Sequence, residues 1–142
     1  MDSTRLLKLG FHKWEAFEKT TIATAPENKG VYAFRGLSSL NLITGSSDIT
    51  YIGRAMSDRK GAYHNIRHSL REYLHPGRGS KGNKTKQRVG ERAPAEGWQV
   101  SWMPTPSPDR MECHLLRQFY HDHGQLPPEN KRWPPACGPE PL

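Results

Sequence analysis

Cysteine is scarce in this chain, and long apolar runs are missing. Only Cys113 and Cys137 are cysteines among the 142 residues; two are too few for a disulfide framework and they form no C-x-x-C pair, so we expect neither to have a role. No apolar run approaches the roughly 20 residues that span a bilayer. Charges interrupt residues 1–10, where a signal peptide needs an apolar stretch. The sequence therefore predicts a soluble, intracellular, cytoplasmic protein without a membrane partner.

Hydrophobic residues are also few, at 34% of the chain, and the mean hydropathy is −0.84. The aromatic content of 9% is still enough for a small core, which excludes wholesale disorder. The 13 glycines and 12 prolines follow no repeat, which excludes collagen-like and low-complexity chains. At roughly 100–200 residues per domain, the length allows one compact domain.

Acidic residues are outnumbered, with 14 Asp and Glu against 21 Lys and Arg, a net charge of +7. The excess is concentrated between Arg54 and Arg92, where eleven bases and three acids give a net charge of +8. Clustered bases release counterions from a phosphate backbone, so this basic segment (54–92) predicts a polyanionic partner, and a solvated surface is the alternative. The candidate backbone-binding residues are Arg59, Lys60, Arg78, Lys81, Lys84, Lys86 and Arg88.

The periodicity of apolar residues predicts strand, strand, helix, strand and helix, in that order. Two short β-type runs joined by a polar loop indicate an antiparallel hairpin, and a third run alternates with period two. Residues 77–90 have almost no apolar side chains and are expected to form a basic loop. This order is typical of an α+β domain with a small, mainly antiparallel sheet. The predicted strands are 31–34, 49–53 and 98–102, and the predicted helices are 63–74 and 111–124.

The predicted elements divide the chain into three parts. Residues 1–29 form an N-terminal extension packed on the domain, with apolar spacings between Leu6 and Phe17 that suit a short helix or a helix followed by a strand. Residues 30–130 form the domain itself. Residues 131–142 form an irregular, proline-rich tail.

Glu112 is the most unusual residue of the last predicted helix. On a helical wheel it lies between Leu116 and Phe119, inside the apolar face. A bare buried carboxylate is costly, so this one must be paired, protonated or bound to a cation. Mg²⁺ often binds through one carboxylate, with waters and substrate phosphates as its other ligands. The alternative is a helix cap, through a capping-box-like pair of Asp109 with Glu112 or a helix start at Ser107-Pro108.

A zinc site is a further alternative, because cysteine and histidine crowd the C-terminal third of the chain. Zinc ligands usually occur in closer pairs, such as C-x₂₋₄-C with H-x₃₋₅-H, and this spacing is absent. Solvated histidines are therefore favoured. The residues concerned are Cys113, His114, His121, His123 and Cys137.

Two tripeptides, Gly30-Val31-Tyr32 and Tyr51-Ile52-Gly53, resemble the signature of the GIY-YIG nuclease family, with valine in place of the usual isoleucine. A strand tyrosine taken singly is an ordinary packing residue. Downstream, residues 70–77 resemble the end of a helix in family members, and Glu112 followed by residues 124–130 resembles their metal-binding glutamate and later asparagine. The resemblance covers about 100 of the 142 residues, in the family's order.

The resemblance implies a three-stranded antiparallel sheet flanked by helices and an endonuclease that hydrolyses phosphodiester bonds in DNA, single- or double-stranded, with RNA a further candidate. Glu112 would ligate one Mg²⁺ or Mn²⁺. Tyr32 or Tyr51 would position or deprotonate the attacking water, and deprotonation would need nearby cations to lower a pKa that is ordinarily near 10. Arg54 would hold the phosphate, and Asn130 would orient the phosphate or a neighbouring side chain.

The sequence departs from the family pattern at one position. Relatives usually carry an arginine four residues before the position of Tyr73, and here that residue is Ser69. Because a guanidinium stabilises charge in the transition state, we keep Arg67 and Arg71 as candidate replacements. Tyr73 itself belongs to the candidate site. The alternative function is a nucleic-acid-binding module on the same fold that does not cleave.

Overall fold

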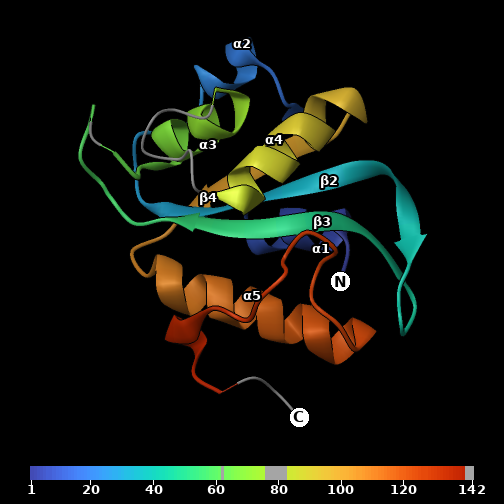
Figure 1. The fold of residues 1–142 in the computed structure, drawn as a ribbon. Coiled ribbons are helices and arrows are strands. Elements are labelled where there is room, and N and C mark those ends of the chain that lie inside the picture. The colour runs from blue at the N-terminus through green and yellow to red at the C-terminus, as the bar shows by residue number, and fades with distance from the viewer. Residues whose placement is uncertain (62, 76–82, 140–142) are drawn as a thin grey trace.

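A four-stranded antiparallel sheet separates two layers of helices in the computed structural model, which describes residues 1–61, 63–75 and 83–139 (Figure 1). The predicted α+β class is confirmed, but the predicted number of three strands is wrong. The additional strand has two residues and pairs Glu15 with Val100. It lies in the N-terminal segment, where a helix followed by a strand was one of the two expectations. In spatial order the strands are β1 (Glu15–Ala16), β4 (Gln99–Pro104), β2 (Gly30–Asn41) and β3 (Ser46–Ala55).

The side chains of the central strand β2 alternate between the two helical layers, as the pleat requires. Val31 and Ala33 pack in one apolar cluster, and Tyr32 and Phe34 pack in the other. Figure 1 shows α5 on one side of the sheet and α3 with α4 on the other. The first layer contains α1 (Ser3–Leu9) and α5 (Pro108–His123), and the second contains α2 (Lys19–Ile22), α3 (Ile66–Leu74) and α4 (Lys84–Ala95).

The helix α4 corrects the expectation of a basic loop over 77–90. Residues from Lys84 onward are helical, with the Asn83 side chain accepting a hydrogen bond from the Lys86 amide as the N-cap. Only Val89 and Ala93 of this helix are buried, so it carries too little apolar periodicity to be recognised. Residues 77–82 of the expected loop lie outside the described residues.

At Gly90 an added Cβ would overlap the carbonyl of Tyr73, so glycine allows α4 to pack directly on the backbone of α3.

The outer edge of the sheet is covered by the chain that follows α5. The Glu129 amide donates to the Thr50 carbonyl oxygen at 2.9 Å. The Asn130 side chain bonds both backbone groups of Ile52: its Oδ1 accepts from the amide and its Nδ2 donates to the carbonyl oxygen, each at 2.9 Å. These bonds satisfy free backbone groups of the edge strand β3 and bring residues 129–130 beside the sheet.

Within the described residues, no helix has the length and apolar character needed to cross a membrane.

Cys113 and Cys137 form a disulfide, so the expectation that neither has a role is wrong. The bond joins α5 to the short 3₁₀ helix Pro135–Cys137 and closes a loop with a sequence separation of 24 residues. No C-x-x-C spacing announces such a pair in the sequence. The tail is therefore tied to the helix that carries Glu112.

Replacing both cysteines by serine is expected to lower the free energy of unfolding by about 3.5 kcal/mol, because the open chain regains the entropy of the closed loop. Urea denaturation measures this loss. A reducing agent should shift the midpoint of the wild-type protein by a comparable amount and leave that of the Cys113→Ser/Cys137→Ser variant unchanged. A wild-type midpoint insensitive to reduction would contradict the disulfide.

Candidate functional site

A pocket of about 870 Å³ lies at the edge strand β3, where the two helical layers meet. Its walls come from β2, β3, α3, α4, α5 and the chain after Asn130, so residues far apart in the sequence meet here. A second pocket of about 260 Å³ shares Tyr51, Glu112 and Lys131 with the first and extends it under the tail. The sequence-predicted residues that line the larger pocket are Tyr32, Tyr51, Arg54, Tyr73, Lys84, Lys86, Arg88 and Glu112.

Three tyrosines from three elements form one cluster in this pocket. The hydroxyls of Tyr32 and Tyr73 are 2.9 Å apart and share a hydrogen bond, and the ring of Tyr51 lies 6.2 Å from that of Tyr73, measured between centroids. Tyr32 lies opposite Gly53 in the β2–β3 register. A Cβ at Gly53 would come within 2.7 Å of Cζ of the Tyr32 ring. The glycine of the second tripeptide therefore makes room for the tyrosine of the first.

Burial keeps the hydroxyls of this tyrosine cluster (Tyr32, Tyr51 and Tyr73) protonated. It raises the pKa of Tyr32 and of Tyr73 well above their ordinary value, and it raises the pKa of Tyr51 despite the opposing charges of Arg88 and Arg54. In this arrangement of charges the tyrosines act as hydrogen-bond donors and acceptors. The lowered pKa that a tyrosine base requires is not present.

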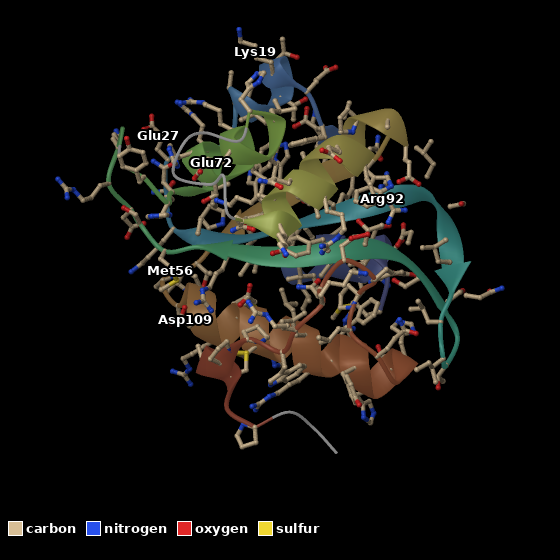
Figure 2. All side chains as sticks on the ribbon, viewed as in Figure 1. Lys19, Glu27, Met56, Glu72, Arg92 and Asp109 are labelled. Carbon is tan, nitrogen blue, oxygen red and sulfur yellow. A yellow bond between two sulfur atoms is a disulfide. The ribbon has the colours of Figure 1, made fainter. Side chains whose placement is uncertain are left out.

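Glu112 lies on the buried face of α5, as the helical wheel predicts, and is 6% exposed. Arg54 Nη1 donates to its Oε1 at 3.1 Å, and Arg54 Nε lies 3.4 Å from Asp109 Oδ1. Burial raises the pKa of Glu112 to about 7, although the adjacent Arg54 opposes the rise. Figure 2 labels Asp109 at the beginning of α5 and Met56 directly after β3.

The helix-cap interpretation of Glu112 does not describe its contacts. One of the two cap alternatives predicted a helix start at Ser107-Pro108, and the helix does begin at Pro108 with Ser107 as the N-cap residue. The Ser107 side chain makes no capping hydrogen bond, however. The Glu112 carboxylate bonds to Arg54 on β3 instead of closing a capping box with Asp109. Glu112 is therefore a buried acid with a pKa of about 7, and it lies between α5 and the edge strand β3.

Several predicted residues lie away from the pocket. Arg67 donates to the Ala25 carbonyl oxygen at 2.8 Å and to Glu27 at 3.0 Å, and Arg71 is exposed. Neither lines the pocket, although Ser69 between them does. Asn130 lines the smaller pocket, where its amide holds the backbone beside Tyr51. The remaining basic candidates are Arg59 and Lys60, exposed after β3, and Arg78 and Lys81, outside the described residues.

Other residues of the site were not predicted from the sequence. Lys131 and Arg132 add two cations to the larger pocket, and His64, which lines it, has a positive φ of 70°. A non-glycine residue in this region is uncommon and often marks a functional segment. Glu129 is 1% exposed and binds guanidinium groups of Arg88 and Arg92 on α4. Lys131 and Arg132 directly follow the predicted Asn130 in the sequence. This position beside a predicted site residue is the one signal that could have identified them.

The cysteines and histidines of the C-terminal third do not form a zinc site. Both cysteines are in the disulfide, and His123 Nδ1 lies 2.9 Å from the Thr44 carbonyl oxygen. In the part of the chain that the structure describes, no group of three or more histidine, cysteine or acidic side chains could hold a metal ion. Glu112 is the one carboxylate among the described residues that line the larger pocket.

Comparison with models of protein families, with curated proteins and with solved structures finds no match for this chain. The assignment of a function therefore depends on the geometry of the pocket and on the two tripeptides, whose tyrosines line it.

Proposed function

We propose that the protein is a metal-dependent endonuclease of GIY-YIG type that hydrolyses phosphodiester bonds in DNA. One observation carries this proposal: the buried carboxyl of Glu112 shares a pocket with the tyrosine cluster and six cationic side chains. An acid placed among cations and hydroxyls suits a negatively charged, hydrolysable ester. The six cations are Arg54, Lys84, Lys86, Arg88, Lys131 and Arg132.

The donor set fits one hard divalent cation, Mg²⁺ or Mn²⁺. Glu112 offers a carboxylate whose Oε1 accepts from Arg54 and whose Oε2 has no hydrogen-bond partner among the described residues. A single protein carboxylate leaves most ligand positions to waters and phosphate oxygens, as Mg²⁺ prefers. The bound cation would neutralise charge on the scissile phosphate and on the leaving oxygen.

The other side chains of the pocket bind and orient the substrate. Arg54 lies between Glu112 and Asp109 and presents positive charge where a phosphate would enter. The protonated hydroxyls of the tyrosine cluster hold the attacking water by hydrogen bonds, since their raised pKa values keep their protons in place at neutral pH. Asn130 fixes the backbone of Ile52 and thereby the neighbouring Tyr51.

The proposal is tested by incubating the protein with labelled single-stranded and double-stranded DNA, with Mg²⁺, with Mn²⁺ and with a chelator. We expect cuts that require the cation and that disappear in Glu112→Ala. Salt-sensitive binding of the same DNA should persist in that variant, because the basic segment is unchanged. Cleavage by the chelated protein, or by Glu112→Ala at the wild-type rate, would contradict the proposal.

A second candidate function is nucleic-acid binding without cleavage. Ser69 favours it, because this short side chain lines the pocket where the family pattern has an arginine. Binding with no cation-dependent cuts on any substrate would support this alternative.

The cytoplasmic location expected from the sequence stays a prediction. The disulfide weighs against it, because disulfides are typical of oxidising compartments.

A further inference from the structure

Arg88 on α4 faces the pocket and is anchored at two points of one residue. Its Nε donates to Glu129 Oε2 at 2.5 Å, and its Nη2 donates to the Glu129 carbonyl oxygen at 3.0 Å. Its Nη1 has no hydrogen-bond partner among the described residues. The side chain is 30% exposed, so this remaining donor group can be reached by a ligand. A guanidinium held on one side and open on the other is pre-organised to bind an oxyanion.

The anchor of Arg88 is itself fixed to the sheet. Glu129 is 1% exposed, and its amide donates to the Thr50 carbonyl oxygen, directly before Tyr51 in β3. The charge of Glu129 is shared with Arg92, whose Nη1 binds Glu129 Oε1. Arg88 itself holds the Glu129 carboxylate through Nε, so it can bind a phosphate through Nη1 without leaving this buried carboxylate unpaired. Figure 2 labels Arg92 on α4, above the sheet.

The other cations of the pocket are occupied or loosely held. Arg54 is bound by Glu112 and Asp109, and the Lys86 ammonium lies 3.2 Å from Glu72. Lys84, Lys131 and Arg132 are exposed, and long exposed side chains lose more entropy when a ligand fixes them. The α3 wall contributes Ser69 and Tyr73 to the pocket and no cation. This distribution leaves the fixed positive charge on the wall formed by α4.

We propose that Arg88 binds a backbone phosphate of the nucleic acid through Nη1, and that Glu129 is the positioning residue that holds it there. The inference rests on the proposed function, because it takes nucleic acid as the ligand of the pocket. It deepens that function by assigning the phosphate-binding guanidinium to α4. Glu129 acts through Arg88 and does not itself contact the substrate.

The first measurement is the binding of a fluorescein-labelled duplex and a labelled single strand in a chelator, followed by anisotropy over a series of salt concentrations. In Arg88→Ala we expect affinity to fall on the order of tenfold. The slope of log K against log salt should fall by about 0.9 for duplex DNA, the value for one lost phosphate contact. Arg92→Ala is the matched control: it removes the other guanidinium on Glu129 from the same helix, and Arg92 does not line the pocket. Its slope should be unchanged.

The second measurement is cleavage with Mg²⁺. We expect kcat to fall by about 10²–10³ in Arg88→Ala and to change less than threefold in Arg92→Ala. Arg88→Lys keeps the charge but cannot bond Glu129 and a phosphate together, so it should bind DNA nearly normally and cleave slowly. Glu129→Gln should lower kcat in the wild-type background and have little further effect in Arg88→Ala, a coupling that a merely structural role would not produce. Circular dichroism melting identifies variants that do not fold.

The outcomes separate this inference from the proposed function. If the wild-type protein does not cleave, the nuclease proposal fails, and a reduced salt slope in Arg88→Ala but not in Arg92→Ala still supports the phosphate contact. If the wild-type protein cleaves and both arginine variants behave alike, the assignment of Arg88 is overturned while the nuclease stands. An unchanged salt slope in a folded Arg88→Ala protein overturns the assignment in either case.

Discussion

The Glu112→Gln variant is expected to lose cation-dependent cleavage by at least about 10³-fold and to unfold at a higher temperature than the wild-type protein at pH 8. Cleavage is lost because a neutral amide is a poor ligand for Mg²⁺ and cannot replace several kcal/mol of charge stabilisation at the phosphate. The amide oxygen can still accept from Arg54, so the buried position stays hydrogen-bonded. The two effects have opposite signs, which distinguishes a functional acid from a structural one.

The gain in stability follows from the raised pKa of Glu112. Burial raises this pKa from 4.5 to about 7, so the folded protein binds more protons than the unfolded chain between these values. Stability must therefore fall as the pH rises from about 4.5 to about 7, and the ionised form costs on the order of 3 kcal/mol above that range. Glutamine does not ionise and avoids this cost. We expect Glu112→Gln to be more stable by about 1–3 kcal/mol at pH 8 and nearly equal to wild type at pH 4.

Asp109→Asn is the matched control, because Asp109 is the other carboxylate beside Arg54 and its side chain is 46% exposed. We expect this variant to change the free energy of unfolding by less than about 0.5 kcal/mol, as surface substitutions usually do. Urea denaturation at pH 4, 6 and 8 measures both variants. A Glu112→Gln protein less stable than wild type at pH 8 would contradict the raised pKa, and one that still cleaves would contradict the role of Glu112.

The part of the site that the sequence predicts is the part carried by regular patterns. Alternation places Tyr32 on one face of β2, and helical spacing places Glu112 on the buried face of α5. These placements follow from periods of 2 and 3.6 residues and need no knowledge of the tertiary fold. Glycine at position 53 has an equally physical reason, since its hydrogen faces the ring of Tyr32.

The wall formed by α4 could not be predicted in the same way. Its buried residues are only Val89 and Ala93, so the helix depends on the Asn83 cap, on residues with good helix propensity and on the contact of Gly90 with α3. The bonds between Arg88 and Glu129 join positions 41 residues apart in the chain. Such pairs depend on how elements pack, which no local pattern encodes. The same holds for the disulfide, whose two cysteines give no paired spacing.

The last prediction concerns the close approach of Gly53 to Tyr32. In Gly53→Ala the added methyl group would lie 2.7 Å from Cζ and 2.8 Å from the hydroxyl oxygen of Tyr32. The ring is 3% exposed and bonded to Tyr73, so it cannot move into solvent without breaking the tyrosine cluster. We expect a loss of about 1–3 kcal/mol in stability from overpacking. Cleavage should fall on the order of 10²-fold, as misplacement of catalytic groups by about 1 Å produces.

Gly36→Ala is the matched control for this substitution in the same pair of strands. A Cβ at Gly36 would lie 3.6 Å or more from its neighbours, an ordinary contact, so stability should be unchanged or slightly higher. The cause is tested by repeating Gly53→Ala in a Tyr32→Leu background. Because the clashing ring atoms are then gone, the methyl group should cost less than about 0.5 kcal/mol there. An equal cost in both backgrounds would show that Gly53 is required by the backbone of β3 and not by the tyrosine that the pocket needs.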